Sequence, residues 1–260
     1  MFLVLGIDAA TWEVIKPNID SLPTFKKLCS MGQCSTLVLK ETPISPSVWC
    51  GMFCGRTPDE HKHDSFVKDG NIVKRDDIKV DFIWDILHRQ GQDVRVLNVP
   101  FIVPPYSFNV DFKPIGFGLP TDAKEWQQEL DAITLKTEEI IKESPGLAIA
   151  IYTLLDRVQH FHWGEDIVLE WYKKLDAKMG RLLFDSGFLE DKNNRLIVIS
   201  DHGFCSFGEA RVQTLPQKTE QGELKGDHHE NAILVTVNVD YQIDRPQDVF
   251  YALQQQLTAT

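Results

Sequence analysis

Acidic and imidazole side chains recur directly after apolar, strand-forming stretches of this chain. Asp201 and His202 follow the apolar run 196–199, and Gly203 then allows the backbone to turn sharply. Open α/β sheets bind their ligands at the carboxyl ends of the strands, where we expect these two side chains to lie. Both are metal-competent, so the stretch could bind a metal ion. Taken alone, it could equally be a strand end with a capping Asp and an exposed His.

A second pair of such residues follows the apolar segment 147–155. Asp156 and His160 are four residues apart, so on a helix their side chains point the same way and could chelate one ion. The alternative is a capping Asp and a partly buried His. Asp8 stands in the same kind of place, directly after the apolar segment 2–7. The arrangement of a strand followed by an acid therefore occurs more than once.

Two adjacent histidines, His228 and His229, precede a predicted strand at 232–239, and either could complete a site. Carboxylates mixed with imidazoles suit zinc or manganese better than magnesium, which prefers oxygen ligands alone. The sequence therefore predicts bound divalent metal, with zinc as the first choice and manganese as the alternative.

Ser45 is followed by Pro46, a pair typical of a helix start. Serine would be the N-cap and proline would take the first helical position, where its missing N–H costs nothing. The N–H groups of Ser47 and Val48 would then be free to bind a phosphate or an oxyanion. A hydroxyl in that place could act as a nucleophile, whereas a plain N-cap serine is the alternative.

The elements that must position these residues alternate between strands and helices. Predicted strands cover 2–7, 34–39, 93–98, 147–155, 196–199 and 232–239, and predicted helices cover 11–19, 22–31, 81–89, 123–144, 165–185 and 246–257. Strands that are apolar throughout are typical of a parallel sheet covered on both faces. We expect a single domain over 1–260 with three α/β/α layers and a mostly parallel central sheet. Segment 64–120, which contains the proline-rich stretch 100–120, is predicted to be a small cap or loop insertion.

Composition excludes several classes of protein. With 43% hydrophobic residues the chain is globular, and a net charge of −11 argues against a nucleic-acid-binding surface. Apolar runs are shorter than the ~20 residues of a membrane helix, and the N-terminus lacks a basic leader. The five cysteines are odd in number and lack zinc-ribbon spacing, which predicts reduced thiols in a cytoplasmic protein. Oligomeric state is left open.

The motifs, in this order, resemble the alkaline phosphatase superfamily and, within it, the type I phosphodiesterase/nucleotide pyrophosphatase family. They are GIDAAT with Asp8, SPSVWCGMFCGRTPDEH with Ser45, LDRVQHFHW with Asp156 and His160, ISDHGF with Asp201 and His202, and GDHHENAILV with His228. The resemblance covers nearly the whole chain and implies an alkaline phosphatase-like fold.

The resemblance also implies two divalent metal ions about 4 Å apart. The ligands that it implies are Asp156, His160 and His228 for one ion, and Asp8, Asp201, His202 and Ser45 for the other. The Gly-x-His spacing favours His228 over His229. Many relatives carry Thr in place of Ser45 and Gly in place of Lys62, so the loop after His61 is expected to have a different shape.

The activity that the resemblance implies is metal-dependent hydrolysis of a phosphodiester or pyrophosphate bond in a nucleotide-type substrate. Ser45 would attack phosphorus and form a phosphoseryl intermediate. A phosphomonoesterase is one alternative; it would need an extra cation, for which Arg157 is the nearest candidate. A non-catalytic metal-binding protein is the other. Sulfatases are disfavoured because the sequence after Ser45 lacks their Cys/Ser-x-Pro-x-Arg context, and phosphomutases because they carry a large inserted domain.

The predicted partner is a small phosphorylated molecule, whose identity the sequence does not give. Specificity would come from the predicted cap. Its aromatic residues could stack a base or a sugar, or could pack beneath the loop; they are Phe66, Phe101, Tyr106, Phe108 and Phe117.

Overall fold

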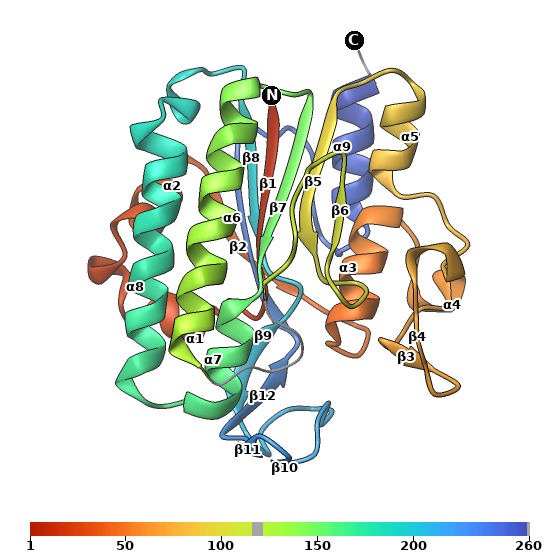
Figure 1. Ribbon diagram of the computed structural model, residues 1–260. Coiled ribbons are helices and arrows are strands. Elements are labelled where there is room, and N and C mark those ends of the chain that lie inside the picture. The colour runs from red at the N-terminus through yellow and green to blue at the C-terminus, as the bar shows by residue number, and fades with distance from the viewer. Residues whose placement is uncertain (116–121, 259–260) are drawn as a thin grey trace.

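The computed structural model describes residues 1–115 and 122–258 and has three layers, with a mixed seven-stranded sheet between two layers of helices (Figure 1). The strand order is β2-β13-β8-β1-β7-β5-β6. The bounds of these strands are β1 Phe2–Ile7, β2 Gln33–Val38, β5 Val94–Val99, β6 Tyr106–Phe108, β7 Leu147–Tyr152, β8 Arg195–Ile199 and β13 Asn231–Val237. Strands β8, β1, β7 and β5 are parallel, whereas β13 and β6 run antiparallel to their neighbours.

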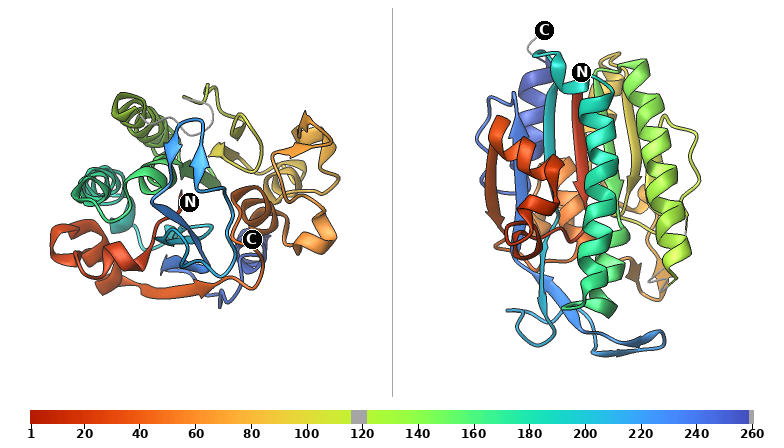
Figure 2. Two further views of the ribbon diagram at one scale, coloured as in Figure 1. Left: turned by 90° about the horizontal axis from the view of Figure 1, so that it is seen from below. Right: turned by 90° about the vertical axis from the view of Figure 1, so that its left-hand side faces the viewer.

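The two helical layers lie on opposite sides of the sheet (Figure 2). The described helices are α1 Trp12–Ile15, α2 Pro23–Met31, α3 Ser45–Cys54, α4 Pro58–His61, α5 Ile83–Arg89, α6 Ala123–Glu143, α7 Leu154–His162, α8 Asp166–Gly180 and α9 Asp248–Thr258. Helices α2, α6 and α8 cover one face, and α3, α5 and α9 cover the other. None of the helices in the described ranges is both long and apolar enough to cross a membrane.

Strand β1 shows why the central strands carry apolar residues throughout. Phe2 and Val4 pack into the core beneath α3, α5 and α9, whereas Leu3 and Leu5 pack into the core beneath α2, α6 and α8. Successive side chains of a strand point to opposite faces, so a strand between two helical layers buries every residue. All six residues of β1 and of β7 are buried accordingly. This confirms the three-layer fold predicted from the sequence.

Two short hairpins extend from the sheet at the carboxyl ends of its parallel strands. The first hairpin pairs β9 (Gly203–Ser206) with β12 (Gly226–His229), and the second pairs β10 (Lys218–Thr219) with β11 (Gly222–Glu223). Both lie beyond the edge where β1, β7 and β8 end (Figure 1). Gly203 is required at the start of β9, because a Cβ there would lie 2.2 Å from the carbonyl oxygen of Asn231.

The structure corrects the predicted end of the strand at 147–155. Strand β7 stops at Tyr152, and Leu154 already begins α7. Leu154 and Leu155 are fully buried on that helix. An apolar run does not distinguish a buried strand from the buried face of a helix, so the boundary was placed too late.

The prediction that all five cysteines are reduced is wrong. Cys29 and Cys34 form a disulfide across the turn that joins α2 to β2, with their Cα atoms 5.4 Å apart. Cys50, Cys54 and Cys205 are free and buried. The cytoplasmic location inferred from reduced cysteines stays a prediction without that support.

Segment 64–120 contributes to the central layers as well as to the loops above them. It contains α5, β5 and β6, and a hairpin of β3 (Val67–Lys68) with β4 (Asn71–Ile72). We therefore propose that any cap is confined to the β3–β4 hairpin and to the loop before β6. Residues 116–120 at the end of the segment, Phe117 among them, lie outside the described residues.

The aromatic residues of this segment divide between packing and the site. Phe101 is fully buried and lies 4.8 Å from Phe82, measured between ring centroids. Tyr106 packs on Trp84 at 5.8 Å, and Phe108 packs against the same core. Phe66 lines a cavity described below. The alternative of packing beneath the loop therefore holds for Phe101, Tyr106 and Phe108.

The turn after α4 places a histidine in the core. Lys62 has a left-handed backbone with φ of 58°, a conformation that glycine adopts most readily. His61, just before it, is 5% exposed, and its Nδ1 accepts a hydrogen bond from the N–H of His63 at 3.1 Å. Burial, with a smaller effect of the nearby His63, lowers the pKa of His61 to about 4.

This pKa predicts a loss of stability in mild acid. The unfolded chain binds a proton at His61 near pH 6.5, whereas the folded protein does so only near pH 4, so the stability is present above 6.5 and lost as the pH falls toward 4. Between pH 7 and pH 5 the free energy of unfolding should fall by about 2 kcal/mol more than in His61→Asn. Urea unfolding at the two pH values measures this difference. Equal losses in both proteins would contradict it.

Candidate active site

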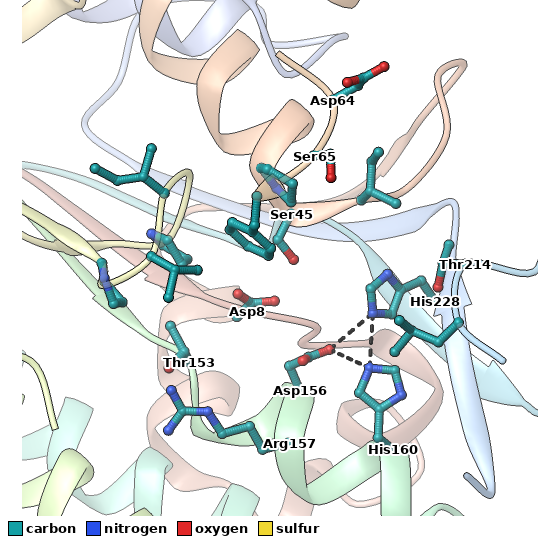
Figure 3. Close-up of a pocket in the computed structure, with 18 residues that line it drawn as sticks. Asp8, Ser45, Asp64, Ser65, Thr153, Asp156, Arg157, His160, Thr214 and His228 are labelled. Atoms are coloured by element: carbon teal, nitrogen blue, oxygen red, sulfur yellow. Dashed lines mark hydrogen bonds and ion pairs between the residues drawn. The ribbon is translucent and has the colours of Figure 1, made fainter. Parts of the chain in front are cut away.

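A cavity of about 480 Å³ opens at the carboxyl ends of β1, β7 and β8. The sequence-predicted site residues that line it are Asp8, Ser45, Asp156, His160 and His228. Figure 3 shows Ser45 directed toward the same space as Asp8, with Asp156, His160 and His228 beside it. The remaining two, Asp201 and His202, are fully buried just behind this wall. The structure thus brings together all seven residues predicted from the sequence.

Three of these side chains form a first cluster. Asp156 Oδ1 lies 3.3 Å from His160 Nε2 and 3.2 Å from His228 Nε2, and the two imidazole nitrogens are 3.1 Å apart (Figure 3). Asp156 and His160 share one face of α7, as their spacing predicts, and His228 comes from β12. The neighbouring His229 turns instead toward Glu230, at 3.8 Å.

A second cluster forms around His202. Its Nε2 lies 3.3 Å from Asp201 Oδ2, 3.6 Å from Asp8 Oδ1 and 3.3 Å from Ser45 Oγ. The rings of His202 and His228 stack with their centroids 3.7 Å apart, so the two clusters are immediate neighbours. The ligand atoms of Asp156, His202 and His228 also lie within 4.8 Å of one another.

Backbone carbonyls fix the orientation of all three histidines. Each Nδ1 lies within hydrogen-bond distance of a carbonyl oxygen: His160 with Gly226 at 3.2 Å, His202 with Gly203 at 2.9 Å, and His228 with Pro43 at 2.7 Å. A carbonyl only accepts, so Nδ1 carries a proton, and Nε2 is the ring atom that each histidine turns toward the carboxylates. This is the usual arrangement of a metal-binding histidine and the backbone group that orients it.

The buried charges of the site perturb its pKa values. Burial, and then the charge of Asp201, raise the pKa of Asp8, and burial raises the pKa of Asp201 to about 6. Burial would also raise the pKa of Asp156, but His160 and His228 outweigh it and hold that pKa well below its usual value. Carboxyls that repel one another in a buried site favour any cation that enters it.

The donor set fits divalent metal. Asp8 Oδ1, Asp156 Oδ1 and Asp201 Oδ2 are buried and have no hydrogen-bond partner among the described residues. Each belongs to one of the two clusters, where imidazole Nε2 atoms face it. Unsatisfied buried carboxylate oxygens are costly, and a metal ion between them would remove that cost. Mixed carboxylate and imidazole ligands are those of zinc and manganese.

The position of Ser45 differs from the prediction. Ile44 is the N-cap of α3, with φ of −118° and ψ of 127°, and Ser45 is the first helical residue. The N–H groups of Ser47 and Val48 donate to the carbonyl of Ile44 at 3.1 and 3.0 Å. They are therefore not free to bind a phosphoryl oxygen, and that part of the prediction is wrong. Because Ser45 does not cap the helix, its hydroxyl remains available to the site.

Several supporting residues were not predicted from the sequence. Asp227 is fully buried and accepts hydrogen bonds from the N–H of His228 at 2.8 Å and from the N–H of Thr214 at 3.1 Å. Gln159 donates to the carbonyl of Ala9 at 2.9 Å, which ties α7 to the loop after Asp8. Asp227 and Gln159 each directly precede a predicted ligand, which is the one signal that the sequence offers for them.

Arg157 is not a free cation, because it already forms an ion pair. Its Nη1 donates to Glu129 Oε2 at 2.5 Å, and Glu129 Oε1 accepts from the N–H and the hydroxyl of Thr153 at 2.8 and 2.9 Å. Arg157 and Glu129 are 7% and 2% exposed. The guanidinium that lines the cavity is thus paired with a buried carboxylate of α6.

Replacing Glu129 by leucine should destabilise the protein by about 3–5 kcal/mol, because it leaves Arg157 buried without its partner. The matched control is Glu138→Leu on the same helix, whose partner Arg181 is 53% exposed, and which should cost less than about 1 kcal/mol. Urea unfolding followed by circular dichroism measures both. Equal, small effects would show that the buried pair does not support the fold.

Solved structures share this fold. The phosphonoacetate hydrolase of Sinorhizobium meliloti 1021 in complex with phosphonoformate is similar with a TM-score of 0.68 and 12% identity, over 98% of this chain and 95% of that one. Murine ectonucleotide pyrophosphatase/phosphodiesterase 5 in complex with AMP is similar with a TM-score of 0.66 and 13% identity, over 99% and 94%. No curated protein sequence matches the chain.

Fold and Asp/His clusters together define an α/β protein of the alkaline phosphatase-like fold with a candidate metal site. The family model for type I phosphodiesterase / nucleotide pyrophosphatase matches residues 2–255, and the chain therefore belongs to that family. The resemblance found in the motifs is confirmed. The protein is a phosphoryl-transfer hydrolase of the phosphodiesterase/pyrophosphatase type.

Proposed function

We propose that the protein hydrolyses a phosphodiester or pyrophosphate bond in a small phosphorylated substrate, with Ser45 as the nucleophile. The observation that carries this proposal is the place of Ser45 Oγ, 3.3 Å from His202 Nε2 and beside both Asp/His clusters on the cavity wall. The named ligands of the two structural neighbours, phosphonoformate and AMP, are small phosphorus compounds and support a substrate of that class.

Each of the two clusters would bind one metal ion. Asp156, His160 and His228 would hold one divalent ion, and Asp8, Asp201 and His202 the other, with zinc preferred over manganese. The bound ions would lower the pKa of the Ser45 hydroxyl and offset the charge of the carboxylates.

Ser45 Oγ would then attack phosphorus in line with the leaving oxygen, which departs as the new bond forms. With a diester, the intermediate would be Ser45 joined to a phosphate that still carries the second ester group, and the proton of Ser45 would pass through solvent to the leaving oxygen. Water would then cleave the bond between Ser45 Oγ and phosphorus, which regenerates the hydroxyl and releases a phosphate monoester. In sum, one diester and one water molecule give one alcohol and one phosphate monoester.

A phosphomonoesterase is the weaker alternative. It would have to bind a dianion, and Arg157, the one Lys or Arg side chain among the described residues that line the cavity, is already paired with Glu129. A diester carries one negative charge fewer than a monoester and therefore fits a cavity without an unpaired cation better. We also keep as proposals that the protein has no nucleic-acid-binding surface and that it acts in the cytoplasm.

The test compares bis-p-nitrophenyl phosphate with p-nitrophenyl phosphate. Metal-stripped protein should be inactive, and addition of Zn²⁺ or Mn²⁺ should restore cleavage of the diester in preference to the monoester. Preference for the monoester would assign a phosphatase. Absence of turnover with both metals bound would favour a non-catalytic metal-binding protein.

A further inference from the structure

Part of the cavity wall is apolar. It consists mainly of side chains from the loop before β6 and from two other loops, and includes Phe66, Pro100, Ile102, Val103, Pro105 and Leu215. We call these six residues the apolar wall. The cavity of about 480 Å³ that they share with Ser45 is in the usual range for small-molecule sites, about 300–1,000 Å³.

The other charged side chains that line the cavity are either negative or paired with an opposite charge. Outside the candidate ligands, the charged lining residues among those described are Asp64 and Arg157. Arg157 is paired with Glu129, and Figure 3 shows Asp64 on the opposite side of the cavity from it. No lysine among the described residues lines the cavity. Asp64 is exposed, so it lies on the solvent side of the cavity, and a second phosphate of the substrate would find no free cation among the described lining residues.

We propose that the preferred substrate is a singly charged phosphodiester in which one ester group is apolar, and not a nucleoside polyphosphate. This inference rests on the proposed function and names the substrate class of the same site. The phosphate would lie at Ser45, and the apolar ester group would lie against the apolar wall. Burial of that group removes apolar surface from water, whereas an extra phosphate placed in the cavity would lose part of its hydration with no unpaired cation among the described lining residues to compensate for it.

The first test varies only the ester group. Methyl p-nitrophenyl phosphate and hexyl p-nitrophenyl phosphate carry the same charge and leaving group and differ by five methylenes. Hexyl should give a kcat/KM about tenfold higher or more, because a tenfold gain corresponds to burial of about two methylenes. ATP, cleaved by water to AMP and pyrophosphate, should be a poorer substrate than the hexyl diester.

The second test reverses the preference with one residue. Val103 is half-buried on the apolar wall, so Val103→Lys should be tolerated and would supply the missing cation. Its kcat/KM for the hexyl diester should fall about tenfold, and its activity on ATP relative to that diester should rise. The control is Val67→Lys, at a position 50% exposed and outside the cavity lining, which should change neither.

Binding separates this inference from the proposed function. Titration calorimetry on Ser45→Ala should show that the hexyl diester binds about tenfold more tightly than the methyl diester. If this preference holds but neither ester is hydrolysed by the native protein with metal, the proposed function fails and the apolar subsite stands. Equal binding and turnover of the two esters, or a preference for ATP, would overturn the inference.

Discussion

Ser45→Ala is expected to lower kcat for bis-p-nitrophenyl phosphate by roughly 10³-fold or more, because removal of a covalent nucleophile removes the reaction path itself. The fold should be unaffected, since Ile44 and not Ser45 is the N-cap of α3. Ser45→Thr supplies the same hydroxyl and should retain measurable activity. Steady-state kinetics at saturating Zn²⁺ measures all three proteins.

The matched control for this loss is Ser47→Ala. Ser47 is buried on the same helix two residues further on and does not line the cavity, so its removal should change kcat only a few-fold. A loss as large as that of Ser45→Ala would indicate a packing defect in α3. Full activity of Ser45→Ala would show that another group, or water directly, attacks phosphorus.

Asp8→Asn should change stability in opposite directions with and without metal. Without metal, Asp8 is buried beside Asp201, and both pKa values are raised by this environment. Neutralising one carboxyl should stabilise the metal-free protein by on the order of 1–3 kcal/mol. With metal at about 1,000 times its Kd, the native protein gains about 4 kcal/mol per site, and the variant should lose much of that gain.

Urea unfolding in chelator and in Zn²⁺ measures the change in the free energy of unfolding under both conditions. The control is Asp176→Asn, a buried acid remote from the clusters that accepts the N–H groups of Thr24 and Phe25 at 3.0 and 2.9 Å. Its effect should be the same in both conditions. If Asp8→Asn lost the same stability in chelator and in Zn²⁺, Asp8 would be an ordinary structural acid, and metal binding would not depend on it.

The sequence predicted most of the site because its geometry follows from secondary structure. Asp8 and Asp201 end strands that are neighbours in the sheet, and β1 and β8 pair in parallel register from Phe2 with Arg195 onward, so both acids reach the same edge. Asp156 and His160 meet because residues four apart share a helix face. Local rules of this kind need no knowledge of tertiary packing.

Features that depend on distant packing were not predictable in this way. Glu129 reaches Arg157 from a helix 28 positions earlier in the chain, and no local pattern links the two. Choosing His228 over His229 required the family spacing, because alternation in β12 shows only that the two point to opposite faces. The Cys29–Cys34 disulfide depends on the turn between α2 and β2, which brings the two Cα atoms within 5.4 Å.

The start of α3 shows how one residue of register alters a functional expectation. A Ser-Pro pair fits two positions at a helix start. Serine can be the N-cap with proline as the first helical residue, or serine can be the first helical residue with proline as the second, because the first turn of a helix accepts proline. The structure has the later register, which occupies the amides of Ser47 and Val48 and leaves the Ser45 hydroxyl facing His202. The nucleophile role is thereby retained as a proposal, whereas the amide site for a phosphoryl oxygen is lost.

Anomalous diffraction at the zinc edge, from crystals grown with Zn²⁺, tests the two-metal proposal most directly. We predict two peaks at about 2.0–2.2 Å from their ligand atoms, one among Asp156, His160 and His228 and the other among Asp8, Asp201 and His202. Ser45 Oγ should be the nearest hydroxyl to the second. A single peak, or zinc bound elsewhere with both clusters empty, would contradict the proposal that the two clusters hold two metal ions.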